Sequence, residues 1–544
     1  MTLFGRGNHK RAFSLPPEYS RVDNLLDPTT PARLEDVIPD RKIYKHRTLV
    51  LCFDGTGEQF DDDNSNVVNL FSMLKKDDPE QQLVYYQAGI GTYSIPQIAQ
   101  PWMAKVHKIL DMMLGHHLDA HVMSGYEFLM QNYSIGDKIC IFGFSRGAYT
   151  ARALAGMIHK VGLLPRHNLQ QVPFAYKMYS REDETGWRLS SNFKKSFSID
   201  VDIEFLGLWD TVASIGLINR RLPFTSSNSN VRYFRHALAL DEHRAKFSPS
   251  LWTHETNDDL SSKFGVSRGE MPKSNPKVKD QEASPEPSPI LKHSHTRQSS
   301  TEKTLHEYEQ EYDANSGSEP CTSVEEVWFS GCHCDVGGGA VKNDTRNALA
   351  RIPLRWMIRE CFKAKTGILF HRELLWKAGL DPGSLAPRAS ERPPVPYSNQ
   401  SEAGSSTLNS PITPTTSQQN PFLKDFVSEE DEDRKDALTR VNDMLKKAPG
   451  WWILEVLPQK IKYLKADPDH PDDQAREVGR GWSWDYKICW ANLGRARHIP
   501  HKHLGRVKVH RTVKLRKEAE AKELEERKKY VPLPKWNFEP LWVD

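Results

Sequence analysis

The chain has 544 residues with 74 Lys and Arg against 71 Asp and Glu, and its net charge of +3 gives no indication of a nucleic-acid partner. It contains no run of roughly 18 apolar residues, as a membrane-spanning helix requires, and its first residues lack the apolar region of a secretory signal. Seven cysteines at irregular spacing indicate reduced thiols, so we expect a cytoplasmic protein.

The first half of the chain predicts a polar arm followed by alternating strands and helices. Residues 1–44 are polar and interrupted by prolines, which favours a disordered arm. The short apolar runs at 47–53, 82–86 and 200–209 predict buried strands of a parallel sheet. Residues 117–133 predict the helix that precedes the next strand.

The most informative stretch is 138–162, with the sequence KICIFGFSRGAYTARALAGMIHKVG. A short apolar run predicts a strand, and apolar residues at helical spacing up to Gly162 predict a helix directly after it. The G-x-S-x-G pattern at the junction is typical of a nucleophile elbow, in which a strained serine is exposed between strand and helix. We therefore expect Ser145 to be a catalytic nucleophile. The alternative is an ordinary serine in a strand-to-helix turn.

Two stretches rich in Ser, Pro and charged residues interrupt the domain, at 266–322 and 383–435. They contain too few apolar residues to form a core, so we expect them to be disordered. Outside them, 324–331 predicts a strand, 352–365 a helix and 515–529 a charged helix. The predicted organisation is a disordered arm (1–44), an α/β core in two parts (45–265 and 323–382), two disordered insertions (266–322 and 383–435), and a C-terminal segment packed on the core (436–544).

A serine nucleophile needs a base, and the base needs an orienting carboxylate. Asp210 closes the strand IEFLGLW, and the carboxyl ends of parallel strands are where open α/β sheets build their sites. It is therefore the expected acid, with a helix cap or a turn former as the structural alternative. Asp202 and Asp241 are rivals, although the sequence around Asp241 suggests a helix with a solvated face.

His333 is the expected base among the 21 histidines. It follows the acid in the chain and lies in VWFSGCHCDVGGG, where an apolar strand opens into a glycine-rich turn. His510 is the alternative, because the histidine is often the last member of such a triad. We expect His236, His243 and the pair His116–His117 to be structural.

A metal site is the other interpretation of Cys332-His333-Cys334-Asp335. Zinc sites usually need ligand pairs separated by two to four residues, and the sequence has no complementary cysteine pair. The acidic run at 61–64 lacks the spacing of a calcium loop. We therefore expect neither a metal ion nor another cofactor.

The loop FDGTG at 53–57 follows the first strand directly. In serine hydrolases one oxyanion donor is the backbone N–H after the nucleophile, here that of Arg146, and the second comes from a nearby loop. We expect the second donor to be Gly55 or Thr56. A tight turn or a phosphate-binding loop is the alternative, but the lysine and hydroxyl residue that end a Walker sequence are absent.

Several motifs together resemble one protein family: CFDGTG at 52–57, NVVNLFSML at 66–74, YYQAGIGT at 85–92, GFSRGAYTARALAGMIHKVGLL at 143–164, FLGLWDTVAS at 205–214 and CHCDVGGG at 332–339. It is the uncharacterised α/β-hydrolase domain family that includes the phospholipase effectors of bacterial type VI secretion. The resemblance covers the ordered parts of 45–340 and, more loosely, the C-terminal motifs WWILEVLP, GRARHIP and VKVHRTVKLR. It implies an α/β-hydrolase core, the triad Ser145, Asp210 and His333, and phospholipids or other esters as substrates.

The sequence thus predicts an α/β-hydrolase-like fold: a mostly parallel sheet with helices on both faces, interrupted by disordered insertions and followed by a mainly helical C-terminal segment. The predicted function is cleavage of a carboxylic ester, a phospholipid or other lipid ester, by a Ser-Asp-His triad. The alternative is a catalytically silent protein of the same fold that acts as a binding or scaffold module. Expected partners are the ester substrate and proteins bound through the disordered segments. The basic stretch 495–516 suggests a membrane contact, for which a solvated surface is the simpler interpretation.

Overall fold

The computed structural model describes residues 37–40, 44–89, 118–212, 221–252, 305–314, 322–393, 426–456, 459–466, 482–489, 491–499, 507–535 and 539–544. All of them belong to one unit, Val37–Asp544. Most of the predicted N-terminal arm and of both predicted insertions lies outside these ranges. No helix within these ranges has the length and apolar character needed to cross a membrane.

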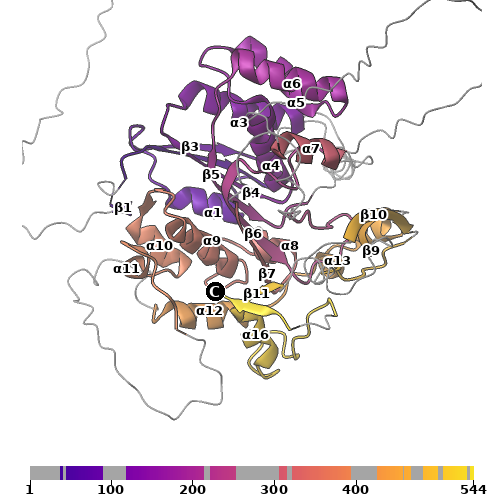
Figure 1. Cartoon of the computed structure of the whole chain (residues 1–544). Helices are drawn as coiled ribbons and strands as arrows, with labels where there is room; N and C mark the ends of the chain where they lie inside the picture. Colours follow the sequence, from indigo (N-terminus) through magenta and orange to yellow (C-terminus); the bar gives the residue numbers. More distant parts are fainter. Residues whose placement is uncertain are drawn as a thin grey trace, which may run out of the picture. The chain divides into compact units, whose positions relative to one another are not determined.

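A parallel sheet of eight strands is the centre of the described chain (Figure 1). Its strands are β2 Thr48–Phe53, β3 Gln82–Gln87, β4 Lys138–Phe144, β5 Ile203–Trp209, β6 Val231–Ala239, β7 Ser323–Phe329, β11 Lys508–His510 and β12 Leu541–Val543. Their spatial order is β12-β11-β7-β6-β5-β4-β2-β3, and every neighbouring pair is parallel. The middle strands are continuous apolar runs because both faces of such a sheet are covered by helices. The predicted fold class is confirmed.

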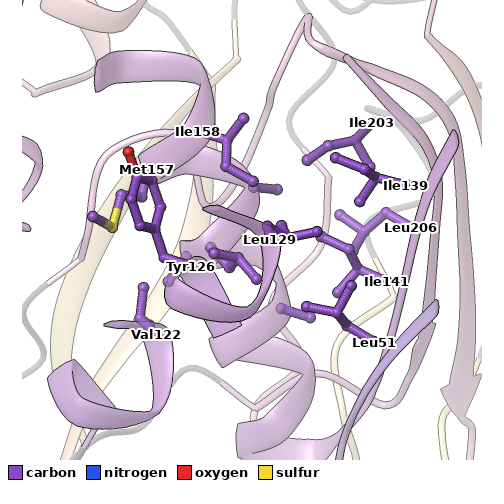
Figure 2. Packing of buried hydrophobic residues seen from close by; sticks show 14 of the residues in the cluster. Leu51, Val122, Tyr126, Leu129, Ile139, Ile141, Met157, Ile158, Ile203 and Leu206 are labelled. Atoms are coloured by element: carbon purple, nitrogen blue, oxygen red, sulfur yellow. The ribbon is translucent and has the colours of Figure 1, made fainter. Parts of the chain in front are cut away.

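One face of the sheet packs against the helices α3 (Leu118–Asn132), α4 (Ser145–Val161) and α5 (Val172–Ser180). Figure 2 shows Tyr126 of α3 among the apolar side chains of this layer, which come from the helices and from the strands. Its hydroxyl donates to the carbonyl oxygen of Gly162 at 2.9 Å, so this buried polar group is satisfied.

The opposite face packs against α1 (Asn66–Met73) and α9 (Arg351–Lys363). Side chains alternate along a strand, so Leu51 of β2 points to the first helical layer and its neighbour Cys52 to the second. This double cover fixes the sheet between two cores. The carboxyl ends of its strands all lie along one edge.

Shorter elements complete the described chain. They are the helices α6 Glu184–Phe197, α7 Leu305–Ala314, α8 His333–Gly337, α10 Arg372–Ala378, α11 Pro382–Leu385, α12 Glu429–Ala437, α13 Met444–Lys447, α14 Trp452–Glu455 and α16 Arg511–Glu518, the 3-10 turns η2 Leu169–Gln171 and η3 Pro449–Trp451, and two antiparallel pairs, β1 Val37–Ile38 with β8 Phe370–His371 and β9 Gln459–Ala466 with β10 Trp482–Cys489. The C-terminal segment therefore combines helices with two further strands of the central sheet.

An ionic ladder joins α9 to α12. Arginines four residues apart on α9 face acidic residues of α12: Arg355 contacts Asp433 at 2.6 Å and Asp436 at 2.7 Å, and Arg359 contacts Glu429 at 2.8 Å. Burial would raise the pKa of Asp433, but Arg355 and other nearby cations lower it below its usual range. The ladder ties α12, which ends at the start of the C-terminal segment, to the α/β core.

The structure corrects three predictions about local structure. Helix α7 lies inside the first stretch predicted to be disordered, and α12 begins inside the second and ends just after it, at Ala437. The first is ordered by Tyr312, which is fully buried against Trp187 and Phe224, and the second by its ionic ladder. The charged helix predicted at 515–529 is α16, which begins at Arg511 and ends at Glu518.

The basic stretch 495–516 is not a uniformly exposed surface. Two of its arginines, Arg497 and Arg516, are buried. Arg516 donates to the carbonyl oxygens of Ala437 and Thr439 and lies over the ring of Tyr530. These two cations are therefore engaged inside the protein and cannot face a membrane.

Candidate active site

Ser145 is the first residue of α4 and directly follows β4. Its φ of 58° is a left-handed backbone conformation that serine rarely adopts. The turn is tight enough to require glycine at Gly147, where a Cβ would lie 2.2 Å from the carbonyl oxygen of Asp54. A strained serine on a sharp strand-to-helix turn has the geometry of a nucleophile elbow.

Asp210 directly follows β5 and is fully buried. Its Oδ1 accepts a hydrogen bond from the backbone N–H of Ala239 at 2.9 Å. Its Oδ2 lies 2.5 Å from Nδ1 of His333. The carboxylate can therefore hold the imidazole with Nδ1 protonated, which leaves Nε2 free to act as a base.

His333 begins α8, a single helical turn placed just after β7. The imidazole lies between two aromatic rings, with centroids 4.7 Å from Phe144 and 4.8 Å from Phe247. Phe144 immediately precedes Ser145, so the histidine lies against the elbow. The turn that carries His333 is helical at its start, and the glycines expected to free it follow at its end.

Three carboxylates hold the backbone before and within α8. Asp241 accepts from the N–H of Gly331 at 2.7 Å, Glu242 from that of His333 at 3.2 Å, and Asp335 from that of Cys332 at 2.9 Å. The backbone around the histidine is therefore fixed by side chains from two segments. This rigidity is what a catalytic imidazole needs.

The surroundings favour an ionised Asp210 and a neutral His333. Burial would raise the pKa of Asp210, but Arg497 and His333 lower it well below its usual range. Burial lowers the pKa of His333, and the contact with Asp210 opposes that shift only in part. At neutral pH the carboxylate is ionised and the imidazole is neutral, as a serine hydrolase requires.

Sequence reasoning missed Arg497, which forms a bidentate ion pair with Asp210. Its Nη1 lies 2.6 Å from Oδ1 and its Nη2 lies 2.9 Å from Oδ2. The two residues are 287 positions apart in the chain. The only signal was the motif GRARHIP, which contains Arg497. It indicated a loose family resemblance but no function for this arginine.

The loop after β2 lies beside the elbow, because a Cβ on Gly55 would lie 2.7 Å from the ring of Phe144. One expected oxyanion donor must be corrected: the N–H of Gly55 already donates to Oδ1 of Asp54 at 2.8 Å. Thr56 has a buried hydroxyl without a hydrogen-bond partner in the described structure. The donors that remain are Thr56 and the N–H of Arg146 at the start of α4.

The side chain of Arg146 is a part-buried cation directly after the serine. Burial lowers the pKa of this guanidinium to about 10, and burial is the single cause of the shift. No charged group in the described part of the chain therefore compensates it. A desolvated, unpaired cation favours an anionic ligand.

The rival residues have other partners. His510 contacts Oγ1 of Thr512 at 2.9 Å, stacks on Phe329 and caps α16. Asp202 is exposed. Asp241, expected on a solvated helical face, is buried in the turn after β6.

The histidines expected to be structural have structural contacts where they are described. His236 lies on β6 and contacts Glu326 at 2.9 Å. His243 contacts Asp443 at 2.9 Å. The pair His116–His117 lies outside the described residues.

Comparisons with known proteins identify one family and several relatives. A model of the catalytic domain of Tle1-like phospholipase effectors of the type VI secretion system matches residues 47–360. An uncharacterised protein of Saccharomyces cerevisiae is 28% identical over 552 residues, covering 84% of this chain and 77% of the yeast protein.

Two solved structures are more distant. An uncharacterised protein from Pseudomonas aeruginosa has 16% identity and a TM-score of 0.29, covering 64% of this chain and 50% of the other. The Tle1 effector bound to the VgrG spike of the type VI secretion system has 18% identity and a TM-score of 0.26, covering 54% and 51%. This chain spans about half the length of these solved chains.

Proposed function

The chain belongs to the Tle1-like phospholipase effector catalytic domain family, and from this premise we propose that it is a serine hydrolase that cleaves lipid esters with Ser145, His333 and Asp210. The observation that carries the proposal is the 2.5 Å contact between Asp210 and His333, beside a serine with a φ of 58°. All three residues follow strands at the carboxyl edge of the parallel sheet, after β4, β5 and β7.

The reaction begins when the Ser145 hydroxyl attacks the ester carbonyl carbon and His333 Nε2 takes the hydroxyl proton. The carbonyl oxygen becomes an oxyanion, which the N–H of Arg146 and a donor of Thr56 stabilise. The tetrahedral intermediate collapses, the carbon–oxygen bond to the alcohol breaks, and His333 protonates the leaving oxygen. Water then attacks the acyl-serine by the same route, releasing the fatty acid and restoring the hydroxyl.

The guanidinium of Arg146 supports a phospholipid as the substrate. A phospholipid presents a phosphate anion a few bonds from its scissile ester, whereas a neutral glyceride presents none. Arg146 directly follows the serine in the chain, and its unpaired guanidinium would gain a charge-assisted hydrogen bond only from the former. The family match at the level of phospholipase agrees with this choice.

The decisive experiment compares wild type with Ser145→Ala, using a fluorophosphonate probe and a phospholipid bearing two labelled acyl chains. Wild type should be labelled and release fatty acid. Ser145→Ala should lose labelling and at least about 10³-fold in rate while keeping its melting temperature. If a folded wild-type protein neither reacts with the probe nor releases fatty acid, the hydrolase proposal is wrong and a binding role takes its place.

A further inference from the structure

The C-terminal part of the chain reaches the active site from outside the matched region 47–360. Arg497 contacts Asp210 through both terminal nitrogens. Asn442 donates to both oxygens of Asp335, from its backbone N–H at 2.9 Å and its side chain at 2.7 Å. Tyr530 donates to Asp241 at 2.7 Å. Each contact ends on a carboxylate that orients His333 or the backbone around it.

Arg497 is the one of these residues that touches the expected triad itself. All five of its N–H groups are used. Nη1 donates to Asp210 Oδ1 and to the carbonyl oxygen of Ala239 at 2.7 Å. Nη2 donates to Asp210 Oδ2 and to the carbonyl oxygen of Phe247, which also accepts from Nε at 3.1 Å. The planar guanidinium thus holds the Asp210 carboxylate and the carbonyl groups of Ala239 and Phe247 in one fixed geometry.

Arg497 makes more contacts than it needs to neutralise the charge of Asp210. Ala239 ends β6, and the carbonyl of Phe247 belongs to the residue whose ring packs on His333. One side chain therefore fixes the carboxylate, the strand end beside it and the residue that covers the imidazole. A lysine has one nitrogen and cannot make these contacts together.

We propose that Arg497 is a positioning residue of the active site, and that the C-terminal segment completes the catalytic apparatus by supplying it. The inference rests on the proposed function for its kinetic consequence, but the geometry of the pair stands without it. Arg497 acts through Asp210 and His333 and contacts no reacting atom.

The cation has two opposing effects on the imidazole. It holds Asp210 where the carboxylate can fix the tautomer of His333, which favours catalysis. It also neutralises part of the negative charge that would stabilise the imidazolium, which lowers the basicity of His333. The other charged groups that face the imidazole are Glu242 and Arg244 from the turn after β6, and they form an ion pair with each other at 2.8 Å.

Two substitutions separate these effects. Arg497→Lys keeps the positive charge and loses the fork, so kcat/KM should fall by on the order of tenfold to a hundredfold because the acid is held less rigidly. The acidic limb of its pH–rate profile, in which kcat/KM falls as His333 becomes protonated, should stay near that of wild type. Arg497→Met removes the charge too, so the midpoint of the acidic limb should move to higher pH as the imidazolium gains stability.

Arg516→Met is the matched control. Arg516 is also a buried arginine of the C-terminal segment, and it donates to backbone carbonyls rather than to Asp210. Its loss should lower the melting temperature and leave the pH midpoint in place. A general loosening of the segment would affect both arginine variants alike, whereas positioning predicts a shift only for Arg497.

A readout independent of catalysis keeps the inference separate from the proposed function. The titration of His333 is followed by nitrogen-15 NMR of labelled histidine in wild type, Arg497→Lys and Arg497→Met, with its signal identified by its loss in His333→Asn. A higher midpoint in Arg497→Met than in wild type supports the inference even for a protein without hydrolase activity. Equal midpoints, or wild-type kcat/KM in Arg497→Lys, would overturn it.

Discussion

The ring of Phe144 lies against the imidazole of His333, with centroids 4.7 Å apart, and links the elbow to the histidine turn. Phe144 is the N-cap of α4, and Ser145 follows it. The far end of the histidine turn also meets this ring, at Gly337. One aromatic side chain therefore sets the spacing between the expected nucleophile and the expected base.

Gly337→Ala should disturb this spacing. A Cβ at this position would lie 1.8 Å from the Phe144 ring, so the ring must move and overpacking should cost about 1–3 kcal/mol of stability. We expect slower fluorophosphonate labelling as well as a lower melting temperature. Gly450→Ala is the control, since a Cβ there meets no atom within 4 Å. Wild-type labelling in Gly337→Ala would show that the spacing has no importance.

His333→Ala and His510→Ala should differ in kind. Removing His333 takes away the expected base, so the rate should fall about 10³-fold or more with little change in the substrate's KM. Removing His510 deletes a stacked ring and a helix cap, so it should lower stability and leave kcat of the folded protein near wild type. Steady-state kinetics at a temperature below both melting transitions separate the two. Activity lost only in His510→Ala would exchange their roles.

The pH profile follows from the direction of the His333 pKa. The base must be neutral to accept the serine proton, and burial holds its pKa below the ordinary value of 6.5 in spite of Asp210. As pH falls, kcat/KM should therefore persist past that ordinary value and decline only through the lowered pKa. The measurement is kcat/KM for a soluble ester across mildly acidic pH. An acidic limb centred above the ordinary value would contradict the buried, neutral imidazole.

Arg146→Gln should change substrate choice. Without its guanidinium, the site loses the cation that we pair with a phosphate, so the ratio of kcat/KM for a phospholipid to kcat/KM for a diacylglycerol of the same chains should fall. A charge-assisted hydrogen bond contributes about 1.5–3 kcal/mol, which corresponds to roughly a tenfold to hundredfold change in this ratio. Both substrates are presented in the same detergent micelles. An unchanged ratio would show that Arg146 does not recognise the headgroup.

The sequence predicted what depends on short-range pattern. A strand, two glycines and a helix within a few residues define the elbow, and Asp210 and His333 were proposed because each follows an apolar strand. The continuous apolar runs likewise predicted the parallel sheet. These features depend on neighbouring residues and on the edge where parallel strands end, both of which are visible without coordinates.

The remainder depends on contacts between distant segments. Nothing in the local sequence distinguishes Arg497 from other arginines, because its partner Asp210 lies 287 residues away. The acidic helix α12 looks like a solvated segment until the arginines of α9 neutralise it. The N–H of Gly55 was expected to be free, but the preceding side chain, Asp54, accepts from it. Pairing of this kind leaves no periodicity to detect.

Because Asp210 and Arg497 are far apart in the chain, the ribosome makes them at different times. The ribosome completes Ser145, Asp210 and His333 well before Arg497. Asp210 and Arg497 are 287 residues apart, so at about 5–20 residues per second the interval between them lasts roughly fifteen to sixty seconds. During that time a nascent chain has its acid without the cation that fixes it. On our proposal, a nascent chain that already carries Ser145, Asp210 and His333 gains its full activity only once Arg497 has joined them.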